Sequence, residues 1–145
     1  MNIKPLEHSS LYCIFCDDIR NEVDGKTSVV GWYADGTQIL MGGAPLVLPK
    51  FSMIGILTIP SEKRPSEMRV DLLKDDEVLQ SISIPYDKLD DGRKDSQPKP
   101  SSLRGLALRL AIQTVNFPID RPCMLRMRVQ FDSIELYSNG LEFSM

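Results

Sequence analysis

Every second residue is apolar in one C-terminal segment, and this alternation constrains the fold more than any other feature of the chain. The segment is 123–131, where Arg126, Arg128 and Gln130 occupy polar positions. The apolar positions are Cys123, Leu125, Met127, Val129 and Phe131. A period of two places successive side chains on opposite faces of a β-strand. The segment therefore predicts a strand with one buried face and one solvated face.

Two further strands are predicted after this one. Asp132-Ser133 is typical of a short turn, after which Ile134–Tyr137 can return antiparallel to the preceding strand. Asn139-Gly140 predicts a second turn, leading into Leu141–Met145. We therefore expect a C-terminal β-meander, with Leu141–Met145 as an exposed edge strand.

Strands are also predicted earlier in the chain. Met68–Leu72 alternates in the same way, and Lys74–Glu77 separates it from the β-branched run Val78–Ile84, which predicts a hairpin. Three segments are apolar on both faces of the pleat, as expected of central strands that are covered on both sides. These segments are Leu11–Cys16, Thr27–Tyr33 and Phe51–Ile59.

The segment Leu103–Val115 fits two structures. Its leucines alternate as in a strand, but they also fit one face of a helix. We favour the strand, because the alternation continues without interruption. Asn116–Pro118 and Asp120–Pro122 would then supply the loop of a hairpin with the strand that begins at Cys123.

These elements predict an all-β protein. A chain of 145 residues has the usual size of one domain, and we expect a single domain over residues 1–145. The polar segment Tyr86–Ser102 has no apolar period and predicts a mobile surface loop. About eight short strands favour an antiparallel β-sandwich of the immunoglobulin type. A partly open β-barrel with one short helix is the alternative.

Charge and composition exclude several classes of function. The formal charge of -3 gives no overall attraction to nucleic acid or to an anionic membrane. The longest apolar runs, such as Met53–Ile59, are far shorter than the roughly 20 residues of a membrane-spanning helix. We find no secretory signal, and three cysteines without paired spacing suit a reducing compartment. We expect a cytoplasmic protein without a membrane segment.

The residues that could carry chemistry are few. Cys13 and Cys16 have C-x-x-C spacing, but residues three apart on a strand face opposite sides of the sheet. A zinc site would need two more ligands, and only Cys123 and His8 offer sulfur or imidazole. With His8 as the only histidine, nucleophilic catalysis by a Ser-His or Cys-His pair has little support. We predict no catalytic residues, no metal and no cofactor.

Arginines are concentrated in residues 101–130, which hold five arginines and a single acid, Asp120. If the two strands of this region pair, Arg109, Arg126 and Arg128 share one face and could bind phosphate or an acidic partner. The alternative is a charged outer face balanced by acids, namely Asp71 and Glu135. No aromatic residues are interleaved to stack bases, which argues against nucleic acid as the partner.

A second cluster lies near the N-terminus, where residues 16–33 read C-D-D-I-R-N-E-V-D-G-K-T-S-V-V-G-W-Y. This segment resembles the opening signature of a family of small uncharacterised bacterial proteins, a domain of unknown function. The family pattern is approximately C/A-D-x-x-R-x-E-x-x-G-K-x-S-[LIV]-x-G-x-[YF]. The resemblance implies a bacterial or phage origin and cytoplasmic residence, and it brings no known activity.

Two interpretations of this cluster remain open. Its charged residues crowd around one turn between two strands; they are Asp17, Asp18, Arg20, Glu22 and Lys26. In the structural interpretation, Gly25 closes the turn and Arg20 pairs with Asp18 or Glu22 to fix the register. In the functional interpretation, the charges surround a recognition site anchored by Trp32 and Tyr33.

Our leading hypothesis is a non-catalytic binding or assembly module that acts through protein–protein contacts at a sheet edge or loop rim. The protein partner is unknown, and a homodimer is one form of the hypothesis. A metal-binding or enzymatic protein that uses the cysteines or the Asp17–Lys26 cluster is the first alternative. An anion or nucleic-acid binder that uses the arginine stripe is the second.

Overall fold

The computed structural model describes residues 8–60, 67–85 and 106–145 of the chain, and these residues form strands and no helix. The strands are β1 (Ser10–Cys16), β2 (Asp18–Asn21), β3 (Thr27–Val30), β4 (Gln38–Leu40), β5 (Leu46–Ile59), β6 (Glu67–Lys74), β7 (Glu77–Pro85), β8 (Leu106–Ile119), β9 (Cys123–Phe131), β10 (Ile134–Tyr137) and β11 (Leu141–Ser144). The all-β prediction is confirmed. The expected mobile loop at 86–102 lies outside the described residues.

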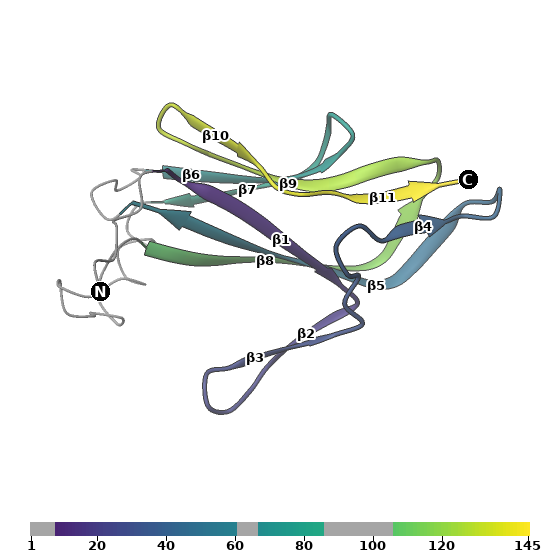
Figure 1. Cartoon of the computed structure of the whole chain (residues 1–145), viewed down its shortest axis with the longest axis horizontal. Coiled ribbons are helices and arrows are strands. Elements are labelled where there is room, and N and C mark those ends of the chain that lie inside the picture. The colour runs from purple at the N-terminus through teal and green to yellow at the C-terminus, as the bar shows by residue number, and fades with distance from the viewer. Residues whose placement is uncertain (1–7, 61–66, 86–105) are drawn as a thin grey trace.

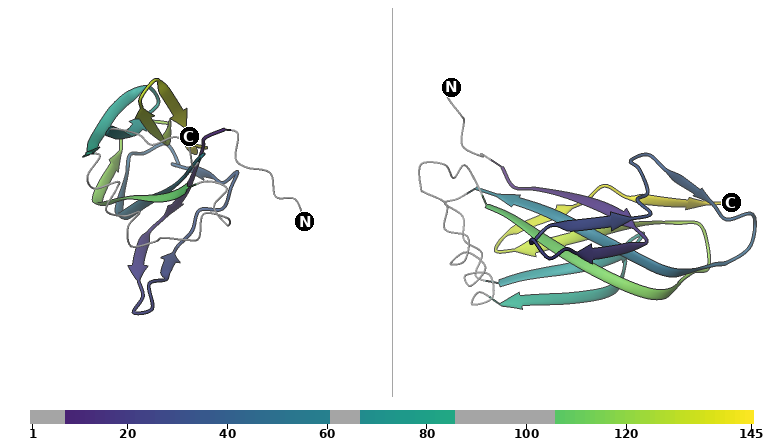
Figure 2. Two further views of the ribbon diagram at one scale, coloured as in Figure 1. Left: turned by 90° about the vertical axis from the view of Figure 1, so that its left-hand side faces the viewer. Right: turned by 90° about the horizontal axis from the view of Figure 1, so that it is seen from below.

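The strands form two facing layers and a separate ribbon (Figures 1 and 2). One layer is an antiparallel sheet of order β1-β5-β8, and the other has the order β4-β11-β9-β6-β7, with β10 also paired to β9. The ribbon is the antiparallel pair β2-β3. This arrangement confirms the β-sandwich, although β4 and β11 run parallel. The immunoglobulin-type topology stays a prediction.

The core lies between the two layers, as the alternation in the sequence requires. The inward residues of β9 are buried, and they meet the inward residues of β5 across the sandwich. Phe51 packs against Phe15 and Phe117 with ring centroids 6.3 and 5.5 Å apart. At Gly55 a Cβ atom would lie 2.3 Å from the sulfur of Met127, so glycine permits the close approach of the layers there.

The predicted hairpin between residues 68–72 and 78–84 is confirmed as β6 and β7. The preference for a strand over a helix in the described part of 103–115 is also confirmed, by β8. However, β8 continues to Ile119, so the loop predicted at Asn116–Pro118 is wrong. Phe117 is buried there and remains in register with Leu48 of β5.

The predicted hairpin between β8 and β9 is wrong as well. The strand β8 pairs with β5, whereas β9 pairs with β6, β10 and β11 in the other layer. Residues 120–122 therefore carry the chain from one layer to the other. Alternation reports which face of a strand is buried, but both layers bury a face in the same core. It does not report which layer holds the strand.

The first half of the predicted C-terminal meander is confirmed, because the chain turns at Asp132-Ser133 and Ile134–Tyr137 returns antiparallel to β9, but the second half is wrong. Antiparallel pairing joins β10 to residues 128–131 of β9, and β11 to residues 123–125 of the same strand. Thus Asn139-Gly140 does not reverse the chain, and β10 and β11 follow one another along one edge of β9. The strand β11 also pairs with β4 and buries Leu141 and Phe143, so it is not the exposed edge expected at 141–145.

The segment Thr27–Tyr33 is not a central strand either. Its strand, β3, ends at Val30 and pairs only with β2 among the described residues, and its side chains are half-buried or exposed. Gly31 follows with a φ of 69°, and Tyr33 then pairs with Phe15 as an isolated bridge. A short run of β-branched residues has the same sequence pattern in an exposed two-stranded ribbon as in a buried core strand. The pattern therefore did not distinguish the two.

No helix able to cross a membrane occurs within residues 8–60, 67–85 and 106–145.

Candidate functional site

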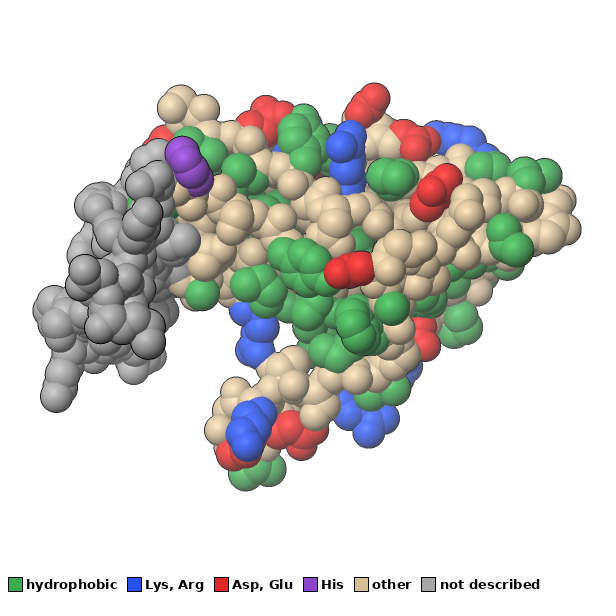
Figure 3. Space-filling model, in the orientation of Figure 1, with side chains coloured by type: hydrophobic (Ala, Val, Ile, Leu, Met, Phe, Trp, Pro, Cys, Tyr) green, Lys and Arg blue, Asp and Glu red, His purple; other side chains and the backbone are tan. Residues whose placement is uncertain are grey.

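The predicted charge cluster lies on the ribbon, which we call the arm and define as residues 17–31. The arm projects from the sandwich, and acidic and basic side chains lie together at its tip (Figures 1 and 3). The backbone N–H of Glu22 donates to the carbonyl of Lys26 at 2.7 Å, and that of Gly25 donates to Glu22 at 3.2 Å. Gly25 has a φ of 83°, so the arm turns at the predicted glycine.

The charges of the arm are largely satisfied by one another. Arg20 lies 3.7 Å from the carboxylate of Asp18, as the structural interpretation expects. Ser28 donates to Glu22 at 2.8 Å, and Lys26 lies 3.4 Å from Asp24. Exposed ion pairs of this kind contribute about 0 to 1 kcal/mol. They support the turn without creating a strongly charged surface.

Asp17 attaches the arm to the sandwich. Its N–H donates to the carbonyl of Val30 at 3.0 Å, and its carboxylate accepts from the hydroxyl of Tyr33 at 3.0 Å. Burial, together with the hydrogen bond to Asp17, raises the pKa of Tyr33 to about 12. Tyr33 also packs against Phe51. These two predicted site residues therefore have a structural role at the base of the arm.

Three apolar side chains of this region are exposed to solvent, namely Val23, Val30 and Trp32. Trp32 follows the arm and is 57% exposed, and Val23 at the tip is fully exposed. Of the aromatic residues predicted as anchors, Trp32 is thus the one available for contact.

The predicted arginine stripe is wrong, because its members lie in different layers. Arg109 is on β8 and donates to the hydroxyl of Thr27 on the arm. Arg126 and Arg128 are on β9, with side chains on the outer face of the other sheet. The stripe depended on pairing between β8 and β9, which does not occur.

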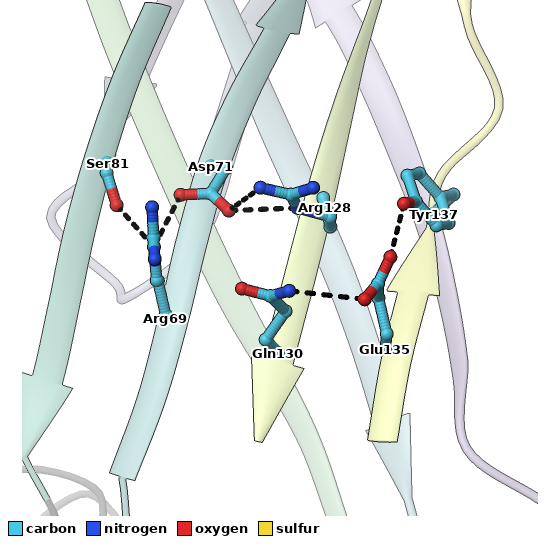
Figure 4. Close-up of polar contacts among 7 residues, drawn as sticks. All are labelled: Arg69, Asp71, Ser81, Arg128, Gln130, Glu135 and Tyr137. Carbon is cyan, nitrogen blue, oxygen red and sulfur yellow. Dashed lines mark hydrogen bonds and ion pairs between the residues drawn. The ribbon is translucent and has the colours of Figure 1, made fainter. Parts of the chain in front are cut away.

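Both β9 arginines have acidic partners, and Figure 4 shows that of Arg128. Arg128 donates to Asp71 at 2.8 and 3.0 Å, and Arg69 donates to the same carboxylate at 3.0 Å. Arg126 lies 3.2 Å from Asp76 and 4.7 Å from the ring centre of Tyr137. The alternative interpretation, a charged outer face balanced by acids, therefore describes Asp71 correctly.

Asp71 is fully buried on this outer face although it carries a charge. Burial alone would raise its pKa, but interactions with Ser81, Arg128 and Arg69 outweigh burial and hold the pKa of Asp71 below its ordinary value. The pKa of Glu135 is also lowered, by hydrogen bonds from Tyr137 and Gln130. The network is thus a set of fixed, mutually paired charges.

The cysteines are buried and protonated at neutral pH. Burial raises the pKa of Cys13 to about 12 and that of Cys16 to about 11, and it also raises the pKa of Cys123. Cys13 faces the core, whereas Cys16 donates to the carbonyl of Asp18 at the base of the arm. The two thiols face opposite sides of β1, as strand geometry predicts. In the part of the chain that the structure describes, no group of three or more His, Cys, Asp or Glu could hold a metal ion.

The strands β7 and β8 form a surface that was not predicted from the sequence. We call this surface the open side. Within the described residues, β7 pairs only with β6 and β8 pairs only with β5. Every residue of β7 is exposed except Ile84, which is half-buried. Val78, Leu79 and Ile82 are 40%, 39% and 36% exposed. A signal was present in the sequence, since no ionisable residue occurs from Val78 to Pro85.

Comparison with known proteins finds no matching family model, no matching curated protein and no matching solved structure.

Proposed function

We propose that this chain is a non-catalytic protein-binding module and that a partner adds an extended strand to its open side, along β7. The observation that supports this proposal most strongly is that an exposed edge strand has almost no charged side chains. The strands β7 and β8 have 9 and 14 residues and contain two ionisable side chains, Glu77 and Arg109, whereas 26% of the whole chain is charged. Depletion of charge is typical of the central part of protein interfaces.

The backbone of β7 supports the same proposal. An edge strand presents a row of N–H and C=O groups that can pair with another chain. Proteins usually protect such edges with lysine, proline, bulges or short strands. Here the protection is confined to the ends of β7, where the register shifts opposite Leu72 and Leu73 and where Pro85 ends the strand. Among the described residues, none of these features occurs from Gln80 to Ile84.

The other candidate groups support binding rather than catalysis. The thiols are buried and protonated, and the β9 arginines are paired with acids. Three free thiols fit a reducing compartment, so we place the proposed activity in the cytoplasm. The resemblance of residues 16–33 to a bacterial family of unknown function agrees with this location and stays a prediction.

Site-specific photo-crosslinking in the producing cell tests the proposal. A benzophenone amino acid at Ser83 on β7 is expected to give protein adducts, either with the same chain or with another protein. Ser133 is the matched control, because it is an exposed serine in the turn between β9 and β10. Adducts that are no more abundant at position 83 than at position 133 would count against strand addition.

A further inference from the structure

We infer that the strand added to β7 is the β7 of a second copy, so that two open sides meet across a two-fold axis at Ser81. This inference rests on the proposed function and names its partner. Two-fold dimers use the same surface on both copies, so the surface must be complementary to itself. The sequence and position of β7 meet this requirement in three respects.

The first respect is charge. In an antiparallel pair centred on Ser81, Gln80, Ser81 and Ile82 face the mirrored positions of the partner, and the bulge beside Leu79 shifts the register beyond them. Glu77 then lies at the opposite end of the strand pair from its own copy, so the single ionisable residue of β7 does not meet a like charge. Like charges directly opposite destabilise a strand pair, and here there are none.

The second respect is the fit of the side chains. Residues directly opposite in an antiparallel pair lie on the same face of the sheet. Ile82 and Ile84 are in register with Val70 and Met68 of β6, which belong to the core, so they point toward the space between the layers. In the dimer Ile82 would face Gln80 on this side of the sheet, whereas the register shift beside Leu79 puts Val78 on the opposite face, level with Leu73. The exposed apolar surface of these side chains would be covered by the partner.

The third respect is the second layer of the sandwich. Viewed along the strands, β7 and β8 lie toward the same side of the molecule, in different layers (Figure 2). A two-fold axis at β7 therefore also brings the β8 strands of the two copies toward each other. Arg109, the single ionisable residue of β8, is already bound to Thr27 on the arm. The contact can thus involve more surface than one strand pair, as a stable dimer requires.

Light scattering of the purified full chain during size-exclusion chromatography tests the stoichiometry. We expect the mass to rise with concentration toward twice that of one chain. Ser83→Lys places a charge on the exposed outer face of β7, and we expect it to raise the dissociation constant by about tenfold. Ser133→Lys, the same change in an exposed turn, is expected to leave the constant unchanged. A monomer at every concentration would overturn the inference.

Disulfide crosslinking tests the register even if the lysine variant fails to fold. A residue on the two-fold axis faces its own copy, so Ser81→Cys is expected to form an intermolecular disulfide when oxidised glutathione is added. Ser83→Cys would face Leu79 of the partner and should crosslink far more slowly. The native cysteines are buried and have raised pKa values, so they react little. Equal crosslinking at positions 81 and 83 would overturn the register.

Different experimental results would overturn the two proposals. If the purified chain stays monomeric while Ser83 photo-crosslinks to another protein in the cell, the second-copy inference is overturned and strand addition stands. If Ser83 gives no specific adduct and the chain is monomeric, both proposals are overturned.

Discussion

Asp71 shows how a charged residue can be buried on the outer face of a sheet. Two guanidinium groups, from Arg69 and Arg128, lie within 3.0 Å of its carboxylate and replace the water that it loses. Asp71 therefore joins β6 to β9 through side chains in addition to the backbone pairing.

Asp71→Asn removes the charge and keeps the shape. We expect it to lower the free energy of unfolding by about 2 kcal/mol, because hydrogen bonds to charged groups contribute about 1.5 to 3 kcal/mol. Urea unfolding followed by circular dichroism measures this change. Asp76→Asn is the matched control, since Asp76 also pairs with an arginine but is almost fully exposed. A loss as large in the control as in Asp71→Asn would contradict this account of the network.

The pH dependence follows from the lowered pKa of Asp71. A carboxyl whose pKa is lower in the folded state stabilises the fold at pH values above its unfolded pKa, and this stabilisation is lost as the pH falls through the folded pKa. The stability difference between the natural chain and Asp71→Asn should therefore be full at neutral pH and shrink below about pH 4. Unfolding titrations at several pH values measure it, and a difference that is constant into strong acid would argue against the assignment.

Gly31 illustrates a backbone constraint at the base of the arm. Its φ is 69°, and a Cβ atom there would lie 2.2 Å from the carboxylate of Asp17. Gly25 also has a positive φ, but its surroundings are empty. Gly25→Ala should therefore cost about 1 kcal/mol from backbone strain alone, and Gly31→Ala should cost clearly more. Equal losses in urea unfolding would show that Asp17 does not hold this turn.

At the scale of the elements, one side chain links the two layers at the edge opposite the open side. The amide of Asn139 accepts from the N–H of Cys13 at 2.7 Å and donates to the carbonyl of Cys13 at 2.9 Å. It pairs with β1 as the backbone of a neighbouring strand would. Nearby, Ser138 fills the gap between β10 and β11 by bonding to both backbone groups of Met127 at 2.9 Å. This edge of the sandwich is therefore closed.

Asn139→Asp tests the link between the layers. The carboxylate keeps an acceptor but directs a second acceptor at the carbonyl of Cys13, so we expect a loss of about 1 to 2 kcal/mol at neutral pH. Protonation below about pH 4 should recover part of it, because a carboxylic acid can donate. Asn21→Asp on the exposed arm is the control. An Asn139→Asp variant as stable as the natural chain at neutral pH would contradict the proposed link.

The sequence predicted the properties of single strands better than the relations between strands. Alternation within β6, β8 and β9 is a local consequence of one buried face, and it identified each strand correctly. Pairing depends on contacts between distant residues, which a period of two does not encode. For this reason the predictions of a hairpin between β8 and β9 and of a reversal at Asn139-Gly140 were wrong.

The same limit applies to the candidate site. The turn at Gly25 and the ion pair of Arg20 are local features; the turn was predicted, and Asp18 is one of the two partners predicted for Arg20, the other being Glu22. The arginine stripe required the correct strand order and failed. The open side was missed because an edge strand differs from a central one only by its neighbours. The lack of charge from Val78 to Pro85 indicated the edge, but its meaning required the topology.

At the scale of the whole molecule, one edge of the sandwich is closed and the other carries little charge. Asn139 and Ser138 close the edge where β1 approaches β10, whereas β7 and β8 present unpaired edges within the described residues. The arm projects elsewhere and carries its own paired charges (Figure 1). The proposed binding surface is therefore separate from the arm.

The fluorescence of Trp32, the only tryptophan of the chain, tests whether the proposed binding surface is separate from the arm. Trp32 follows the arm and is exposed, so self-association through β7 should leave its fluorescence emission unchanged over a concentration series. Emission that shifts to shorter wavelength as the dimer forms would place Trp32 in the contact and contradict this arrangement. Light scattering on the same samples confirms that association has occurred.

Hydrogen–deuterium exchange of the β7 backbone, measured by mass spectrometry at low and high protein concentration, tests the central claim most directly. At low concentration we predict rapid exchange of the β7 amides that point away from β6. At high concentration these amides should become protected, while exchange in the arm stays unchanged. Exchange in β7 that is already slow at low concentration, or that does not depend on concentration, would contradict the claim that a second copy pairs with this edge.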